Sequence, residues 1–295
     1  MDNAVELVNL TKKFGDFVAV NNLTISIPKG KIYGFLGPNG SGKSTTIRML
    51  TGVLLPTGGS GSVLGFDILT NGESVKPFIG YMSQKFSLYN DLTVQENLEF
   101  YAGVYGLSKA ARRERSTKIV TMARLSGREN ELTVNLSGGW RQRLALGCAI
   151  MHDPQVLFLD EPTSGVDPVS RRMFWDVICD LAENGTTIMV TTHFIDEAEH
   201  CDLIGIIFQA NLICQGTPDE IRALLPGDLY RIDTEYPAKS IEELERQSLD
   251  NVKDMYAQGA GVHILTVKGK PLNIANVRKI EPTLEDVFVS LVQKK

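Results

Sequence analysis

Gly37-Pro38-Asn39-Gly40-Ser41-Gly42-Lys43-Ser44-Thr45 predicts more about this 295-residue chain than any other segment. It matches G-x-x-x-x-G-K-[ST], a loop whose backbone N–H groups surround nucleotide phosphates while a lysine reaches the β and γ groups and a hydroxyl binds Mg²⁺. The apolar run Lys31–Leu36 predicts a buried parallel strand before it, and the apolar spacing of Thr45–Leu50 predicts a helix after it. The phosphates would lie at a helix N-terminus, which favours anions. A glycine-rich turn is the alternative, and the flanking elements argue against it.

Composition sets the broad class of protein. Hydrophobic residues make up 43% of the chain, enough for a normal core, and the net charge of −5 gives no global attraction to nucleic acid or anionic lipid. The longest apolar runs are strand-sized, so we expect no membrane span. The acidic start Met1–Glu6 does not resemble a secretory signal, which predicts a cytoplasmic protein. The spacing of the four cysteines favours reduced thiols over a zinc site or a disulfide framework.

Two acidic residues follow a second apolar run. Val156–Leu159 predicts a buried strand, and Asp160 and Glu161 come directly after it. Ligands of parallel sheets bind at the carboxyl ends of the strands, so Asp160 could hold Mg²⁺ through water and Glu161 could lie beside an attacking water. The β-rich run Thr186–Thr192 ends at His193, at the same edge, where a contact with the γ-phosphate is credible. The alternatives are a polar strand end and a histidine with only local hydrogen bonds.

The other segments predict an ordinary alternation of elements. Capping signals predict helices that begin after Thr93 and after Thr283, each with an acidic residue three positions on. The glycines between Thr51 and Phe66 predict turns, and Phe14 lies between two strands as either a stacking platform for adenine or a packed residue. Further elements are expected at these ranges: strands at Val5–Leu10, Leu23–Ile27, Ile79–Gln84, Leu229–Thr234 and Val262–Val267, a hairpin at Gly205–Gly216, and helices at Ser108–Leu125, after Gly139, after Asp167, from Pro218 to about Leu225, and at Ile241–Gln247.

Taken in order, these motifs resemble the ATP-binding subunit of an ABC transporter over roughly residues 3 to 220. The set comprises the phosphate loop, Gln84 after a strand, Leu136-Ser137-Gly138-Gly139 before a helix, Asp160-Glu161, Ser164-Gly165-Val166-Asp167, and His193. The segments Asn90–Asn97 and Pro282–Phe288 are similar to the ABC-2 type exporter branch. One residue departs from the family pattern: the fifth signature position, usually glutamine, is Trp140.

The resemblance implies a fold and a domain organisation. The expected fold is an α/β P-loop NTPase (RecA-like) core with an antiparallel β-subdomain and an inserted helical subdomain, followed by a small α+β appendage. The ATP-binding domain would span residues 1–225, with the helical subdomain at about 86–152, and the accessory domain would span residues 226–295.

The resemblance also implies roles for individual residues. Lys43, Glu161 and His193 would be catalytic, with Glu161 as general base or water-positioning group and His193 on the γ-phosphate. Ser44, Gln84 and Asp160 would hold Mg²⁺, with Asp160 acting through water. The adenine of ATP would stack on Phe14. The rest of ATP would contact the following residues: Gly37, Pro38, Asn39, Gly40, Ser41, Gly42, Lys43, Ser44, Thr45 and Gln84 in one subunit, and Ser137, Gly138, Gly139 and Asp167 at the subunit junction.

Partners follow from the same resemblance. Two cassettes, identical or similar, would close head to tail around ATP, and hydrolysis would reopen them. The pair would power separate integral-membrane permease subunits at the cytoplasmic face of the cell membrane, with no nucleic-acid partner. Two other functions stay open: a soluble ABC-type ATPase acting on ribosomes or DNA, and an ATP-sensing regulator without turnover.

Overall fold

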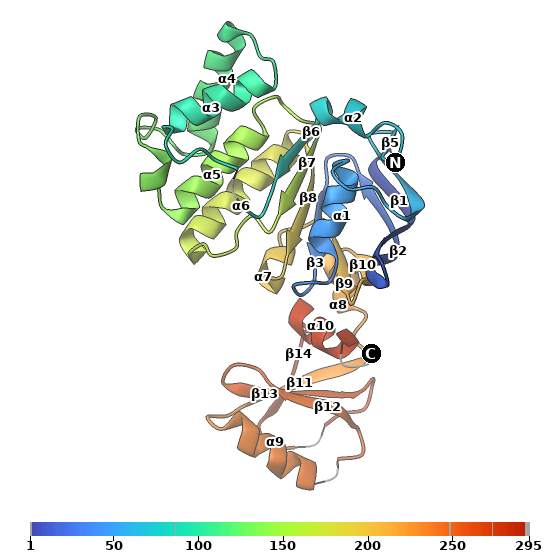
Figure 1. The fold of residues 1–295 in the computed structure, drawn as a ribbon. Coiled ribbons are helices and arrows are strands. Elements are labelled where there is room, and N and C mark those ends of the chain that lie inside the picture. The colour runs from blue at the N-terminus through green and yellow to red at the C-terminus, as the bar shows by residue number, and fades with distance from the viewer. Residues whose placement is uncertain (1, 86, 248, 273, 293–295) are drawn as a thin grey trace. The chain divides into compact units, whose positions relative to one another are not determined.

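The computed structural model describes residues 2–85, 87–247, 249–272 and 274–292, and separates a first unit, residues 1–218, from a second unit, residues 219–295 (Figure 1). The boundary therefore lies between Pro218 and Asp219, whereas the sequence analysis placed it after residue 225. Residue 86, the expected start of the helical subdomain, lies outside the described residues, as do positions 1 and 293–295 at the expected domain ends.

A six-stranded sheet forms the centre of the first unit. Its strands are β3 (Ile32–Leu36), β6 (Ile79–Met82), β7 (Val156–Asp160), β8 (Thr187–Thr192), β9 (Leu203–Phe208) and β10 (Asn211–Gly216), in the order β10-β9-β3-β8-β7-β6. All neighbours pair in parallel except β10, which is antiparallel to β9. Every residue of β3, β7 and β8 is buried, as expected for central strands of a parallel sheet. The phosphate loop, the acidic pair and His193 consequently share one edge.

A second, antiparallel sheet has the order β2-β1-β4-β5, with β1 (Asn3–Phe14), β2 (Phe17–Pro28), β4 (Gly58–Val63) and β5 (Phe66–Asp67). The β1–β2 hairpin is confirmed. The prediction of turns from 51 to 66 was wrong at β4, which pairs with β1. Glycine is required there by close approach: a Cβ at Gly59 would lie 2.2 Å from the Asn9 carbonyl oxygen, and one at Gly61 2.8 Å from Leu7.

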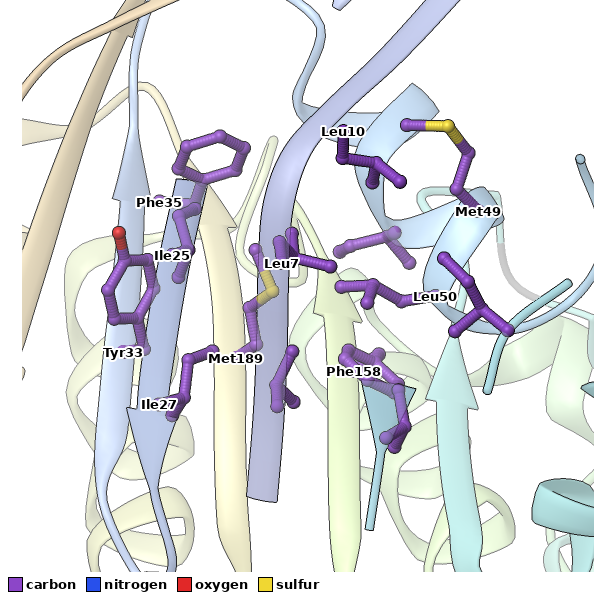
Figure 2. Close-up of a cluster of buried hydrophobic side chains, with 14 of the residues drawn as sticks. Leu7, Leu10, Ile25, Ile27, Tyr33, Phe35, Met49, Leu50, Phe158 and Met189 are labelled. Atoms are coloured by element: carbon purple, nitrogen blue, oxygen red, sulfur yellow. The ribbon is translucent and has the colours of Figure 1, made fainter. Parts of the chain in front are cut away.

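The core of the first unit lies between these two sheets. Helix α1 (Lys43–Leu50) packs in this layer, and Figure 2 shows Met49 and Leu50 of α1 beside Leu7 of β1 and Phe158 of β7. Because the layer contains long side chains from both sheets, it fixes the phosphate loop at the start of α1 against the rest of the domain.

The other helices of the first unit gather on the far side of the central sheet or at its ends (Figure 1). Helices α5 and α6 pack against β6 and β8, and α3 packs on α4 and α5. The predicted capping box of α3 is confirmed, because Thr93 and Glu96 bond each other's backbone N–H groups. The helices of this group have these bounds: α2 (Gly72–Val75), α3 (Val94–Val104), α4 (Lys109–Met122), α5 (Gly138–Ala149), α6 (Pro168–Glu183), α7 (Ile195–Ala198), and the 3₁₀ turns η1 (Lys76–Phe78) and η2 (Thr133–Asn135).

The second unit contains an antiparallel sheet of order β12-β13-β11-β14 and two helices, α9 and α10, that are longer than α8. Helix α8 (Pro218–Arg222) begins at the last residue of the first unit. The other elements are β11 (Gly227–Asp233), α9 (Pro237–Arg246), β12 (Val252–Ala257), β13 (Gly261–Val267), β14 (Val277–Ile280) and α10 (Leu284–Val292). Leu244 of α9 packs on Val262 and Ile264, while Asp286 of α10 bonds His263 between them, so the helices cover opposite faces of β13. The edge strands β12 and β14 were not predicted, because their polar sequences carry no alternating apolar signal.

Candidate functional site

The phosphate loop connects β3 to α1, and its backbone requires glycine at positions 37, 40 and 42. Gly40 and Gly42 have φ values of +79° and +109°. A Cβ at Gly42 would lie 2.4 Å from the Ala19 carbonyl oxygen, and one at Gly37 would lie 2.2 Å from the Ile207 carbonyl oxygen. Gly42 is the N-cap of α1, so no side chain caps the first N–H groups of this helix. Those groups are available to an anion.

A buried hydroxyl in the same loop also lacks a partner. Ser41 is 3% exposed, and its Oγ makes no hydrogen bond to any described residue. A buried polar atom without a partner is costly unless a ligand or water satisfies it. The loop therefore has the features of a phosphate cradle.

Lys43 is buried, and three protein groups hold its ammonium. Nζ donates to the Gly37 carbonyl at 2.8 Å and to the Pro38 carbonyl at 3.0 Å, and it lies 3.1 Å from Oε1 of Glu161. The exposed fraction is 4% for Lys43 and 7% for Glu161. In this structure the cation of the phosphate loop is thus paired with the proposed general base.

Asp160 and Glu161 extend from the end of β7 in different directions. Asp160 Oδ1 accepts hydrogen bonds from Ser44 Oγ at 2.9 Å and Thr191 Oγ1 at 2.8 Å. Burial raises the pKa of Asp160, and these two hydrogen bonds partly oppose that effect. Glu161 has a φ of +47°, unusual for a residue with a side chain, and its N–H donates to Thr191 Oγ1 at 2.9 Å. With this strained backbone, the Glu161 carboxylate lies against the Lys43 ammonium.

Gln84 and His193 complete the cluster around Glu161. Gln84 Nε2 donates to Glu161 Oε2 at 3.1 Å. His193 Nδ1 lies 3.3 Å from the same oxygen, but at an angle that makes no hydrogen bond, and its imidazole contacts the Phe194 ring at a centroid distance of 4.1 Å. The structure therefore brings together Lys43, Gln84, Glu161 and His193, which lie far apart in the sequence.

A cavity of about 290 Å³ opens beside this cluster. It is lined by Phe17, Ala19, Asn39, Gly40, Gly42, Lys43, Ser44, Thr45, Gln84 and Glu161. Most of these belong to the phosphate loop or to the acidic cluster. Its position at the N-terminus of α1 suits a ligand with an anionic group.

The oxygen donors beside the cavity fit Mg²⁺. Ser44 offers a hydroxyl, Gln84 an amide oxygen and Asp160 a carboxylate, which is the kind of donor set that binds Mg²⁺ together with substrate phosphates and water. Among the described residues there is no cluster of three or more His, Cys, Asp or Glu side chains that could hold a metal without a substrate. When bound, Mg²⁺ would neutralise the charge of the phosphate oxygens.

The aromatic residue predicted to stack on adenine lies at the tip of the β1–β2 hairpin. Phe14 and Phe17 are direct cross-strand partners, and Phe17, which the sequence analysis did not select, lines the cavity. Phe14 does not line it and is 50% exposed, with Lys12 Nζ 5.0 Å from its ring centroid. The stacking role of Phe14 stays a prediction.

The signature segment does not line its own chain's cavity. Ser137, Gly138 and Gly139 begin α5, and the exposed Ser137 side chain forms no capping hydrogen bond within the described residues. Asp167 also lies off the cavity and caps α6 by accepting a bond from the Ser170 N–H at 2.9 Å. A Cβ at Gly139 would lie 2.5 Å from Ser170, which explains this glycine.

Trp140 is held between two arginines. The guanidinium carbons of Arg128 and Arg143 lie 4.3 and 3.9 Å from its ring centroid. Burial, followed by nearby arginines, lowers the pKa of Arg143. Such cation–π contacts stabilise the indole where the family usually has glutamine.

Sequence reasoning missed Thr191, which bonds both Asp160 and the Glu161 N–H, and Glu197, whose buried carboxylate accepts hydrogen bonds from Thr163 and Thr192. A threonine at the end of a β-rich run carries no distinctive signal. Glu197 appears in the sequence only as one acidic residue of a short polar segment.

Comparisons with known proteins agree with this geometry. A sequence model described as "ABC transporter" matches residues 20–164. Over 227 residues the chain is 48% identical to "Probable multidrug ABC transporter ATP-binding protein YbhF" of Escherichia coli (strain K12), an alignment that covers 77% of this chain and 39% of that protein's length. It is 38% identical over 304 residues to "Linearmycin resistance ATP-binding protein LnrL" of Bacillus subtilis (strain 168), covering 96% of each.

Solved structures resemble the first unit in fold as well as in sequence. The chain superposes with a TM-score of 0.66 and 28% identity on the "Dimeric structure of a post-hydrolysis state of the ATP-binding cassette MJ0796 bound to ADP and Pi", covering 72% of this chain and 98% of that one. The expected P-loop fold with its antiparallel β-subdomain is thereby confirmed.

Proposed function

Since this chain belongs to the family of ABC transporter ATP-binding proteins, we propose that it binds and hydrolyses ATP to power a separate permease of the ABC-2 exporter type. The observation that carries the proposal is the cluster in which Lys43, Gln84 and His193 all surround the carboxylate of Glu161 beside the phosphate loop. The chain spans 39% of the length of YbhF, so activity, substrate and partners are proposed from this chain's own site.

Two chains are needed to complete the ATP site. The phosphate loop and the Glu161 cluster surround one side of the cavity, while Ser137 lies off that cavity with a side chain that caps nothing within the described residues. We propose that Ser137 to Gly139 of a second cassette, with Asp167 at the junction, contact the ATP bound by the first. The post-hydrolysis dimer with ADP and Pi among the similar structures supports this arrangement.

ATP binding would rearrange the contacts of Lys43. Its ammonium leaves Glu161 and contacts the β- and γ-phosphates, whose charge it balances. The carboxylate of Glu161, still bonded by Gln84, then orients the attacking water and accepts its proton. His193 contacts the γ-phosphate, and Phe14 stacks on the adenine. Because neither chain supplies every contact, closure depends on the γ-phosphate, and hydrolysis reopens the pair.

We propose an integral-membrane permease as the partner of this chain. Among the described residues, every helix is too short or too polar to cross a bilayer. We propose that the helical subdomain at about 86–152 contacts the permease at the cytoplasmic face of the membrane. Tyr89 and Phe100 support this placement: they are 44% and 41% exposed and lie in edge-to-face contact at 4.6 Å, forming an aromatic surface next to the exposed Val104.

Export is supported by the names of the relatives, which describe multidrug transport and linearmycin resistance. A nucleic-acid partner is disfavoured because cations of α4 already contact protein groups. Arg115 bonds the Ile150 carbonyl and Asp153, and Lys118 pairs with Glu114.

Two measurements test the proposal. Purified chain should release phosphate from Mg-ATP, and absence of release with intact ATP binding would favour the ATP-sensing regulator. Tagged chain extracted from membranes in detergent should co-purify with an integral-membrane protein. Recovery with ribosomes or DNA, and not with a membrane protein, would contradict the exporter assignment.

A further inference from the structure

Glu197 in α7 has a carboxylate buried among motif residues, with only 1% of the residue exposed. Its Oε1 accepts a hydrogen bond from Thr163 Oγ1, and its Oε2 accepts one from Thr192 Oγ1 at 2.6 Å. Because each threonine bonds a different oxygen, the carboxylate connects the segment that follows β7 to the last residue of the neighbouring strand β8.

Each bridged threonine is tied to a group of the proposed site. The Thr163 carbonyl accepts the Val166 N–H at 3.2 Å, at the start of the loop that leads to Asp167, and Thr163 lies two positions after Glu161. Thr192 immediately precedes His193, and its carbonyl accepts the Gly37 N–H at 3.2 Å. One side chain therefore connects the segments that hold the general base, the histidine and the phosphate loop.

An ion pair only partly offsets the cost of burying this carboxylate. Arg171 Nε lies 3.4 Å from Glu197 Oε1 and forms an ion pair with it, but Nε makes no hydrogen bond with any described residue. The guanidinium also lies 4.1 Å from the Phe194 ring centroid and donates to Asp196 at 3.4 Å. Burying a carboxylate costs several kcal/mol, and an apolar side chain would avoid that cost. The two hydrogen bonds from threonine hydroxyls are the feature that an apolar residue could not supply.

We propose that Glu197 is a positioning residue for ATP hydrolysis. Its carboxylate, acting through Thr163 and Thr192, sets the distance between Glu161 and His193 and so aligns the attacking water with the γ-phosphate. Glu197 itself touches no substrate. This inference rests on the proposed function, because it assigns Glu197 a part in the same reaction.

Two substitutions distinguish the length of the Glu197 side chain from its charge. Glu197→Gln keeps the length of the side chain: its oxygen can accept from Thr192, and its nitrogen can donate to the Thr163 hydroxyl. Glu197→Asp keeps the charge but is one methylene shorter, so it cannot bridge both threonines. We expect kcat for Mg-ATP to stay within about threefold in Glu197→Gln and to fall about 10- to 100-fold in Glu197→Asp, with KM changed less than about threefold in both. If Glu197→Asp is as active as the natural chain, or more active than Glu197→Gln, the inference is wrong.

A measurement without turnover keeps the two proposals distinct. The Cε1–H NMR resonance of His193 can be assigned by comparison with His193→Gln, and His263 of the second unit serves as an unaffected reference. Glu197→Asp should shift or broaden the His193 resonance, and Glu197→Gln should leave it in place. A natural chain that binds ATP without hydrolysing it would refute the proposed function, and the resonance would still decide the positioning role. An unmoved His193 resonance in Glu197→Asp would overturn that role.

Discussion

Replacing Lys43 with methionine should destabilise the nucleotide-free chain as well as weaken ATP binding. Methionine keeps an unbranched stem of similar volume but removes the charge. The loss leaves Glu161, 7% exposed, as a buried carboxylate with Gln84 Nε2 as its one hydrogen-bonding side-chain donor among the described residues. It also removes the donor to the Gly37 and Pro38 carbonyls. Removing one partner of a buried ion pair costs about 3 to 5 kcal/mol.

Coulomb's law gives a similar magnitude. For charges at the observed Nζ–Oε1 separation of 3.1 Å, an effective dielectric constant of about 20 gives an attraction of about 5 kcal/mol. For a unit of this size, 3 to 5 kcal/mol corresponds to a fall in Tm of about 6 to 20 °C. The measurement is thermal unfolding by circular dichroism without nucleotide.

The matched control is the double variant Lys43→Met/Glu161→Gln, in which neither charge is left unpaired. It should be more stable than Lys43→Met alone by about 2 kcal/mol or more, because contacting charges are coupled by 0.5 to about 3 kcal/mol. A Lys43→Met chain that melts within about 2 °C of the natural one would refute the reasoning. So would a double variant that is no more stable than Lys43→Met.

Three further outcomes are expected. Glu161→Gln should retain ATP affinity, lose at least about 100-fold in kcat, and form a dimer with Mg-ATP on size-exclusion chromatography; a monomer, or normal turnover, would count against a general base at this position. Phe14→Ala should weaken ATP binding about fivefold or more in a fluorescence titration, since stacking on a base contributes about 1 to 3 kcal/mol, whereas Phe17→Ala should have the smaller effect; the reverse order would move the stack to Phe17. Burial raises the pKa of Asp286, but hydrogen bonds from Tyr256 and neighbouring donors outweigh this effect, so the pKa is lowered. The ionised Asp286 should therefore stabilise the fold above about pH 4, and this stabilisation should be lost as the pH falls through the lowered pKa. Asp286→Asn should remove that acid dependence from the unfolding of the second unit, and an unchanged pH profile would show that another group is responsible.

Local sequence was sufficient to predict an element and its functional groups where both lie within one continuous segment. The phosphate loop needs glycines at 40 and 42 for their positive φ and follows a run of buried strand residues, so strand, loop and helix were all predictable. The Thr93–Glu96 box likewise predicted the start of α3, because both partners lie within one turn. Family resemblance added the order of the motifs and hence the fold.

Tertiary structure alone decided the features that depend on distant neighbours. Gly58–Val63 is a strand because it pairs with β1, and its glycines allow β1 to approach closely; no pattern within those six residues reveals this partner. Lys43 pairs with Glu161, although the two residues are far apart in the chain. Likewise, Glu197 bonds both Thr163 and Thr192, which belong to parts of the chain that come together only in the folded sheet. Sequence periodicity records which side of a strand is buried, whereas contacts between parallel strands depend on their order in the sheet, and that order is set by packing of the whole domain.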